Sequence, residues 1–289
     1  MLKKKWQKIL LIPLASILLL GAVYFITVII ANNQDFGVTF YQVTSKKVNS
    51  RIRIVQLSDL HMHEFGKDNE ELVDEIKRLK PNIIAVTGDM NNDYNKDYGV
   101  AITLCRRLVK IAPVYYSLGN NEYTAFLFKK SKILSDLKSV GVHIMHNKAE
   151  VVNIGNNPVQ IIGISENGKG LRDTFGAKET TVKRFEKKFG EYKDGFKLLL
   201  IHYPEVFLNV MSDFDVDLAL AGHAHGGQIR IPFIGGLYSP GEGFFPKLTE
   251  GYHVFKHNRL IISRGLGNSK MIPRINNKPE LVVIDVNQY

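Results

Sequence analysis

Apolar and polar positions divide the chain into two parts. The first is an apolar run without any charged residue, from Ile9 to Ala31. As a helix this run would be about 34 Å long at ~1.5 Å per residue, enough to cross a hydrocarbon layer of about 30 Å. From about Asp35 onward, short apolar runs alternate with amphipathic segments, which is typical of a globular α/β domain.

The apolar run predicts a transmembrane anchor. A cleaved secretory signal is the alternative, but its apolar part usually has about 7–15 residues and ends in a small-x-small site. This run is longer and ends in "VIIANN", which favours an uncleaved anchor over residues 9–31. Since positively charged flanks stay in the cytoplasm, the lysines within residues 1–8 predict a single-pass protein of the cell membrane whose remaining chain is extracytoplasmic.

The domain is predicted as one unit over residues 51–289, after a linker and first strand at residues 32–50. Val38–Thr44 alternates like an antiparallel strand, and residues 149–165 predict a hairpin turning at residues 155–158. Further strands are predicted at residues 51–59, 82–89, 113–120, 196–202, 216–223, 253–265 and 280–286. Apolar residues at helical spacing predict helices at residues 68–81, 97–111, 126–141 and 181–194.

The helix predicted at residues 68–81 has a clear start signal. Asp68 can cap its first turn, and Glu71 stands three residues later, as in a capping box. The sequence therefore predicts that this helix begins directly after Asp68.

Composition narrows the classes of function. The chain has 289 residues, 45% of them hydrophobic, and a single cysteine, Cys105. One cysteine excludes an intrachain disulfide and any cysteine-rich metal site, and its place on an apolar helix face predicts a buried thiol. The formal net charge of +10 includes four lysines within residues 1–8. Without a clustered basic stripe in the rest, we predict no nucleic-acid partner, and the sequence indicates no protein partner.

Metal-capable side chains follow five of the predicted strands. In α/β sheets the carboxyl ends of the strands are where ligand sites are built, so these side chains should converge. The i, i+2 spacing in "DLH" and "HAH" would direct both side chains of each pair to one side of an extended backbone. Glycines before three of the candidates would allow close approach of the backbone. The candidates are Asp59, His61, Asp89, Asn120, His202, His223 and His225.

Seven donors exceed what one tetrahedral ion needs. If Asp89 bridges, two ions receive four protein ligands each, with positions left for water and substrate. Imidazole, carboxylate and amide donors without thiolate favour two divalent manganese, iron or zinc ions. An isolated histidine or aspartate at a strand end is usually a capping or solvated residue, so the prediction depends on the joint pattern. Glu122 could also reach the site, but the dipole of the helix it begins is an adequate explanation for an acidic residue at this position.

Five short blocks, in this order, resemble those of the calcineurin-like metallophosphoesterases. They are "DLH" at 59–61, "GD" at 88–89, "GNNE" at 119–122, "IHYP" at 201–204 and "GHAHGGQ" at 222–228. The resemblance extends from about residue 51 to residue 289. These blocks and the N-terminal apolar run together make the chain most similar to a membrane-associated bacterial phosphodiesterase branch of that family.

The resemblance implies a fold, a ligand assignment and a reaction. The fold would be α/β, a four-layer α-β-β-α sandwich behind an N-terminal transmembrane helix. The reaction would be hydrolysis of phosphodiester or pyrophosphate bonds by a hydroxide that bridges two metal ions, without a protein nucleophile. One ion would be held by Asp59, His61, Asp89 and His225, and the other by Asp89, Asn120, His202 and His223.

One block departs from the family pattern. Family members typically have a histidine beside the leaving group where this chain has Asn121. An amide can donate a hydrogen bond to a phosphoryl oxygen but cannot deliver a proton near neutral pH. We therefore expect a preference for pyrophosphate linkages or activated diesters over alkyl monoesters. The alternative function is a metal-stabilised, membrane-bound binding module with little or no turnover.

A Gly-rich, aromatic loop at residues 231–248 directly follows the last block. Its apolar side chains either line a wall for a lipid-linked substrate or rest on the membrane. Alternatively they plug the open end of the sandwich, which the usual burial of apolar residues favours. The predicted substrate is a phosphorylated small molecule or a lipid, such as a cell-envelope precursor. The side chains concerned are Phe233, Leu237, Phe244 and Phe245.

Overall fold

The structure is a computed structural model that describes most of the chain. It covers residues 13, 15–24, 27, 35–92, 98–128, 131–165, 187–190, 195–211, 214–239, 242–255, 258–268 and 274–289. Much of the anchor predicted at residues 9–31, and most of the helix predicted at residues 181–194, lies outside these ranges. Within them, no helix has the length and apolar character needed to cross a membrane.

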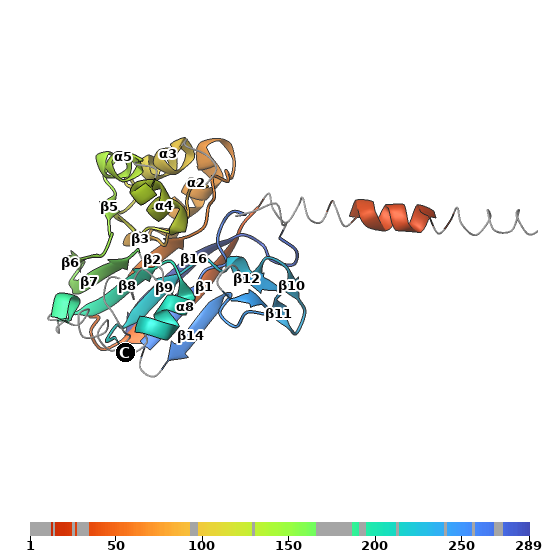
Figure 1. The fold of residues 1–289 in the computed structure, drawn as a ribbon. Helices are drawn as coiled ribbons and strands as arrows, with labels where there is room; N and C mark the ends of the chain where they lie inside the picture. Colours follow the sequence, from red (N-terminus) through yellow and green to blue (C-terminus); the bar gives the residue numbers. More distant parts are fainter. Residues whose placement is uncertain are drawn as a thin grey trace, which may run out of the picture.

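Two six-stranded mixed sheets form the centre of the domain (Figure 1). The first has the order β1-β16-β2-β3-β4-β5, and the second has the order β14-β15-β9-β8-β7-β6. The first sheet contains β1 (Gly37–Ser45), β2 (Ile52–Leu57), β3 (Ile83–Val86), β4 (Val114–Tyr116), β5 (His143–Ile144) and β16 (Glu280–Gln288). The second contains β6 (Lys148–Ile154), β7 (Asn157–Ile164), β8 (Phe196–Ile201), β9 (Leu218–Ala221), β14 (Gly251–Phe255) and β15 (Asn258–Ile262).

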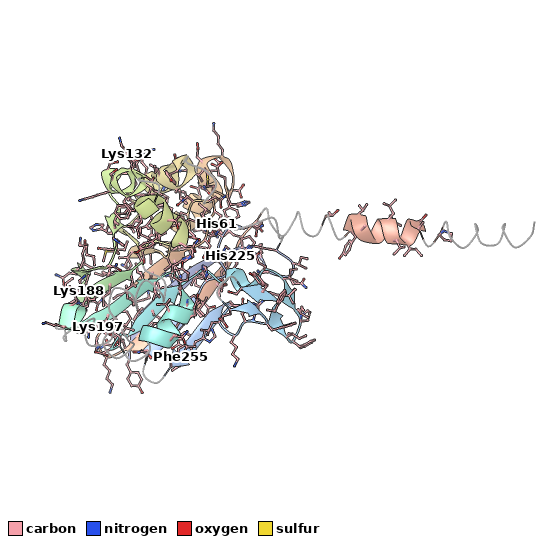
Figure 2. All side chains as sticks on the ribbon, viewed as in Figure 1. His61, Lys132, Lys188, Lys197, His225 and Phe255 are labelled. Carbon is pink, nitrogen blue, oxygen red and sulfur yellow. The ribbon has the colours of Figure 1, made fainter. Side chains whose placement is uncertain are left out.

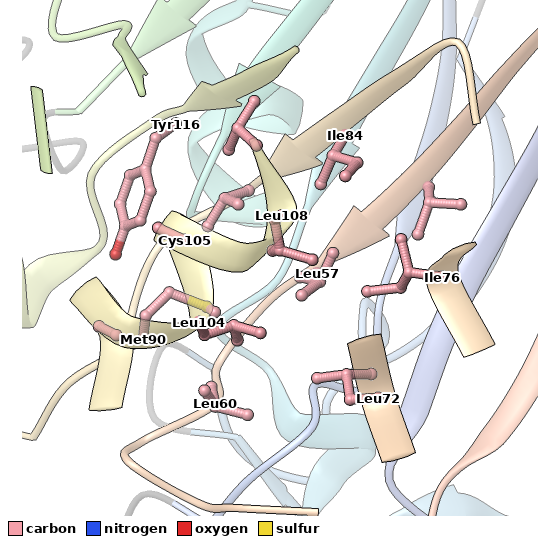
Figure 3. Close-up of a cluster of buried hydrophobic side chains, with 14 of the residues drawn as sticks. Leu57, Leu60, Leu72, Ile76, Ile84, Met90, Leu104, Cys105, Leu108 and Tyr116 are labelled. Carbon is pink, nitrogen blue, oxygen red and sulfur yellow. The ribbon is translucent and has the colours of Figure 1, made fainter. Parts of the chain in front are cut away.

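Helices cover the outer faces of the two sheets. Figure 1 shows α2 (Glu70–Leu79), α3 (Gly99–Leu108), α4 (Asn120–Phe128) and α5 (Ile133–Ser139) together on the first sheet. Short segments, α8 (Pro204–Val206) and η2 (Phe207–Met211), pack on the second. An apolar cluster fills the space between the sheets, and a second one fills the space between the first sheet and its helices (Figure 3). The α/β class predicted from the sequence is therefore confirmed.

Burial explains why these segments form strands. Every residue of β3, β8 and β9 is buried, because these central strands have one face on the other sheet and one face under helices. Strands β2, β3, β4 and β5 run parallel, as do β7, β8 and β9. Their carboxyl ends therefore lie along one edge of each sheet, which is where the chain can build a site.

The pairing of the first strand differs from its prediction. The alternation in Val38–Thr44 suggested an antiparallel strand, but β1 runs parallel to β16 over its whole length. β1 is an edge strand, so the alternation reflects one covered face and one exposed face and says nothing about the direction of its neighbour. β16 itself runs antiparallel to β2, which makes the sheet mixed.

Two helix predictions also need correction. Asp68 does not cap α2: it lies in the short turn η1 (Lys67–Asn69) with φ 54°, and Asn69 precedes the helix without a side-chain cap bond. The amide oxygen of Asn69 instead accepts a hydrogen bond from the Phe65 N–H, which ties the turn together. The helix predicted at residues 126–141 is divided into α4 and α5, and α4 begins earlier, at Asn120.

The loop after β9 folds into two short hairpins. After η3 (His225–Gly227), β10 (Arg230–Ile231) pairs with β11 (Gly235–Gly236), and β12 (Tyr238–Ser239) pairs with β13 (Gly243–Phe244). Phe233, Phe244 and Phe245 are exposed, so the prediction that they plug the end of the sandwich is wrong. The hairpin hydrogen bonds fix the backbone, and the rings are turned to solvent.

Candidate metal centre

All seven predicted ligands come together where the carboxyl edges of the two sheets meet. His61 and His225, one from each sheet, lie close to each other in Figure 2. The Asp59 carboxylate joins the sheets directly, because it accepts a hydrogen bond from the His223 N–H at 3.0 Å. Six of the seven side chains are buried, and Asn120 is half-buried. The convergence expected at the strand ends is thus what the structure has.

The first group of donors contains Asp59, His61 and His225. His61 Nε2 is 3.2 Å from His225 Nε2, and Asp59 Oδ1 lies 3.5 Å from His225 Nε2 and 3.9 Å from His61 Nε2. Two ligands of a tetrahedral ion with bonds of about 2.1 Å stand about 3.4 Å apart. These three donors therefore have the spacing of ligands that share one ion.

The second group surrounds His202 Nε2. This nitrogen lies 3.5 Å from Asp89 Oδ2, 3.2 Å from Asn120 Oδ1 and 3.1 Å from His223 Nδ1. Asp59, Asp89 and His202 have donor atoms that all lie within 4.8 Å of one another, which makes them the second candidate ligand group. Asn120 and His223 adjoin this group through His202 Nε2. Asp89 Oδ2 is 3.9 Å from His61 Nε2, so it faces both groups. Asp59 Oδ1 also faces both groups, because it lies 4.0 Å from His202 Nε2. The assignment of Asp89 as the bridging ligand therefore stays a prediction.

Hydrogen bonds behind the ligands orient them toward a metal. His202 Nδ1 lies 2.7 Å from the Thr87 carbonyl oxygen, and His61 Nδ1 lies 3.0 Å from Asn92 Oδ1. With the proton of each ring donated to these oxygens, the Nε2 lone pair of each ring is free for an ion. Ser58 donates to Asp59 Oδ2, which leaves Asp59 Oδ1 to face the histidines.

Burial and charge set the protonation of the protein groups. Burial lowers the pKa of His223 to about 3 and that of His225 well below its ordinary value, so both offer neutral nitrogen donors. Burial also opposes charge on His202, but the facing Asp89 carboxylate outweighs it and raises the His202 pKa. Burial opposes the charge on Asp89, but the facing His202 ring outweighs burial and lowers the pKa of Asp89. Burial raises the pKa of Asp59.

The backbone at the ligands is not extended, which corrects the reason given for the "DLH" and "HAH" pairs. Asp59 and His61 have φ of 52° and 48°, and His223 and His225 have φ of 67° and 49°. Non-glycine residues rarely adopt this left-handed region, and it recurs at functional sites because tertiary contacts impose it. Each pair converges through these turned residues and not through the two-residue repeat of a strand.

The glycines before the ligands are required by close approach. A Cβ on Gly119 would lie 2.1 Å from Asp89 Oδ1, and a Cβ on Gly222 would lie 2.3 Å from Asp59 Oδ2. A Cβ on Gly88 would lie 2.2 Å from the Gly119 nitrogen, and Gly88 also has φ of +90°. The predicted role of these glycines is confirmed, although only Gly88 needs the conformational freedom of glycine as well.

Glu122 is a part of the site whose role the sequence reasoning missed. Its carboxylate is fully buried and accepts hydrogen bonds from the N–H groups of Asp89, Met90 and Gly119 and from the Tyr116 hydroxyl. Burial, and then the Asp89 charge, raises the pKa of Glu122 to about 7. Glu122 thus ties the Asp89 loop to the first turn of α4, which carries Asn120. Its spacing from Gly119, as in a capping box, was the available signal.

Asn121 supports the Asp89 ligand and packs beside His61. Its N–H donates to Asp89 Oδ1 at 2.9 Å, and its side-chain Nδ2 donates to the Asn91 carbonyl oxygen at 2.8 Å. The same Nδ2 is 3.3 Å from His61 Nδ1. The side chain is buried, so the structure gives Asn121 a positioning role, and a direct role toward substrate stays a prediction.

A buried arginine stands behind His225. Arg274 has no exposed surface, and its Nη2 donates to the carbonyl oxygens of Gly267 and Arg264 and lies 3.4 Å from His225 Nδ1. It follows a stretch of sequence without strand or helix periodicity, and so gave no signal in the sequence.

The other described histidines contact groups outside the two donor sets: His143 contacts Glu150, and His253 contacts the Glu250 carbonyl.

Comparison with known proteins agrees with this geometry. Residues 52–227 match the family described as "Calcineurin-like phosphoesterase", and the chain belongs to this family. It is therefore a metal-dependent phosphoric ester hydrolase, as its sequence blocks predicted. The two groups of donors form its candidate dimetal site.

Bacterial relatives cover most of the chain. "Uncharacterized metallophosphoesterase YkuE" of Bacillus subtilis (strain 168) is 28% identical over 236 residues, which are 80% of this chain and 77% of that protein. "Phosphodiesterase YaeI" of Escherichia coli (strain K12) is 27% identical over 239 residues, which are 81% of this chain and 82% of that protein. Among solved structures, TT1561 of Thermus thermophilus aligns with a TM-score of 0.49 and 13% identity, covering 75% of this chain and 91% of that one.

Proposed function

We propose that this protein hydrolyses phosphodiester or pyrophosphate bonds with two divalent metal ions, from among manganese, iron and zinc. The observation that carries the proposal is the pair of donor groups, with Asp59 and Asp89 between them. Such ions supply an activated water and positive charge for the phosphoryl oxygens when bound. The protein residues hold the donors in place, through the Thr87 carbonyl at His202 and through Asn92 at His61.

The preference for diesters and pyrophosphates has two supports. Asn121 occupies the position where family members have a histidine, and its amide cannot deliver a proton to a leaving group near neutral pH. One relative, YaeI, carries the name phosphodiesterase. Substrates whose leaving groups need no proton are therefore the best match to this site.

An assay of the purified full-length protein tests the function. We expect manganese-dependent hydrolysis of an aryl phosphodiester, with loss of turnover in Asp89→Asn and His202→Gln. His143→Gln is the matched control, because this half-exposed histidine on β5 contacts only Glu150 among the hydrogen bonds and ion pairs found for its side chain. Two bound metals without turnover on any phosphodiester or pyrophosphate would favour the binding module.

Replacement of Asn121 by histidine tests the expected substrate preference. Asn121→His should raise the rate on an alkyl monoester such as glycerol phosphate relative to the aryl diester, because the imidazole can protonate the alkoxide. If the wild type already prefers alkyl monoesters and the histidine gives no gain, the proposed preference is wrong.

We place the protein in the cell membrane, with the catalytic domain outside the cytoplasm. The support is the uncharged apolar run at residues 9–31, which follows four lysines within residues 1–8. This location makes lipids and cell-envelope precursors with phosphodiester or pyrophosphate linkages the proposed substrates. An alkaline phosphatase fused after Tyr289 should be active in cells, because that reporter folds only outside the cytoplasm; an inactive, intact fusion would reverse the orientation.

A further inference from the structure

The two short hairpins beside the metal centre present large apolar side chains to solvent. Phe233 and Ile234 lie at the turn of β10–β11, and Phe244 and Phe245 lie in and after β13. Phe233 is fully exposed, Phe244 is 71% exposed and Ile234 is 64% exposed. Single exposed apolar residues are ordinary, but a group of them on adjoining hairpins marks a contact surface. We call these four residues the aromatic tip.

The backbone of the aromatic tip is unusual for the residues it carries. Phe233 has φ of 66° and Phe245 has φ of 53°. In the first hairpin the Ile234 N–H donates to the Ile231 carbonyl, which puts Phe233 at a turn position where glycine is normally found. A bulky residue in this conformation is strained, and an exposed ring gains nothing from burial in return. Contact with an apolar partner would account for both features.

Backbone hydrogen bonds connect the aromatic tip, through Leu237, to the turn that follows His225. The Leu237 N–H donates to the carbonyl oxygens of Gly227, at 3.1 Å, and Ile229, at 2.8 Å. The Phe245 N–H in turn donates to the Leu237 carbonyl at 2.8 Å. Gly227 stands two residues after His225, so the hairpins that carry the aromatic tip are fixed to the backbone next to a candidate ligand.

The start of the domain lies near the same hairpins. Asp35 forms an ion pair with Lys278, and the Gly37 N–H donates to the Pro279 carbonyl at 2.8 Å. A few residues earlier in that C-terminal segment, the Ile275 carbonyl accepts a hydrogen bond from the Arg230 N–H of β10 at 2.9 Å. The segment at residues 275–280 therefore connects the first described residues of the domain to the hairpins.

The length of the intervening chain fixes what the hairpins can meet. The apolar run ends at Ala31, and four residues at ~3.6 Å each span at most about 14 Å to Asp35. With residues 9–31 in a membrane, the β10–β11 side of the domain is held close to its surface. Figure 1 shows β10 and β11 on the right of the molecule and β6 on the left, away from them.

We propose that the aromatic tip inserts into the membrane interface and holds the metal centre against the lipid surface. Phe and Ile side chains suit this zone because interfacial segments bury such apolar side chains at the boundary between headgroups and acyl chains. The proposal rests on the membrane anchoring proposed above. It gives the site a reason to act on phosphate groups carried by lipids, which would then reach the ligands without leaving the bilayer.

Tryptophan quenching in the full-length chain tests the proposal. The chain has one tryptophan, Trp6, just before the apolar run. In a Trp6→Phe background, Phe233→Trp and Phe244→Trp are reconstituted into phosphatidylcholine vesicles that contain lipid with a nitroxide near the headgroup end of the acyl chain. Val151→Trp, at a position on β6 that is 55% exposed, is the matched control. We expect most of the emission to be lost at residues 233 and 244 and retained at residue 151.

Trp6 in the unmodified chain separates this proposal from the anchoring. Quenching of Trp6 without quenching at residues 233 and 244 would overturn the aromatic tip and keep the anchor; the tip would then face water or a protein partner. Quenching at residues 233 and 244 without quenching of Trp6 would keep the tip and overturn the anchor. No quenching at any of the three positions would overturn both.

Discussion

Gly119→Ala should damage the metal centre through the addition of one methyl group. The new Cβ would stand 2.1 Å from Asp89 Oδ1 and 2.4 Å from the Asp89 nitrogen. Asp89 cannot easily withdraw, because its N–H is held by Glu122 and its Oδ1 by the Asn121 N–H. The substitution therefore acts on a predicted ligand of both ions without altering any donor atom.

The size of the effect follows from the overlap. Non-bonded carbon atoms are at their optimum about 3.5–4.0 Å apart, so even against the smaller oxygen the groups must separate by roughly 1 Å. Overpacking of this kind costs about 1–3 kcal/mol. At about 2–4 °C per kcal/mol for a domain of this size, Tm should fall by roughly 2–12 °C. A displacement of about 1 Å at a reacting centre reduces turnover by on the order of 10²-fold.

Three measurements on the purified variant check this reasoning. They are the metal content after manganese loading, kcat on an aryl phosphodiester, and Tm from circular dichroism. Gly37→Ala is the matched control, because its Cβ would meet no atom closer than 3.8 Å. If Gly119→Ala keeps two metals, the wild-type kcat and the wild-type Tm, the close packing of Gly119 on Asp89 is not needed to hold this ligand in place.

Two further outcomes are expected. The Asp89 carboxylate raises the pKa of His202, so a proton must leave this ring before a metal binds. Calorimetry in buffers of different ionisation enthalpy should show proton release and a metal affinity that rises with pH. A metal affinity that does not depend on pH would contradict this expectation. Burial raises the pKa of the Cys105 thiol to about 12, so mass spectrometry should find iodoacetamide adducts only after denaturation, and alkylation of the folded protein would show an accessible thiol.

Most strands could be predicted because a short run of apolar residues in the sequence indicates a buried strand. β3 and β9 are continuous apolar runs, and β8 is interrupted only by Lys197. A residue of the candidate site follows each of these strands within three positions. The hairpin of β6 and β7 was predicted from its turn residues and is confirmed. Cys105 is buried, as its apolar helix face indicated. In each case the signal lies within a few neighbouring residues.

Other features depended on contacts between distant parts of the chain. β1 pairs parallel to β16, more than 200 residues later, and its own alternation could not show that direction. Asp68 has the sequence of a cap, yet the turn closed by Asn69 on Phe65 holds it outside the helix. The rings of the aromatic tip were expected inside because they are apolar, but the paired hairpins leave them exposed.

The sequence by itself determined which donors exist and that each stands at the end of a buried strand, since apolar runs and the residues after them are local properties. The tertiary structure decided how those donors are grouped. Asp59 and His223 meet through a hydrogen bond between residues 164 positions apart, and Glu122 joins Asp89 to α4 across 33 positions. The contact between Asp59 and His223 arises because the two sheets pack face to face and bring their carboxyl edges together. The contact between Glu122 and Asp89 arises because β3 and β4 are neighbours in the first sheet.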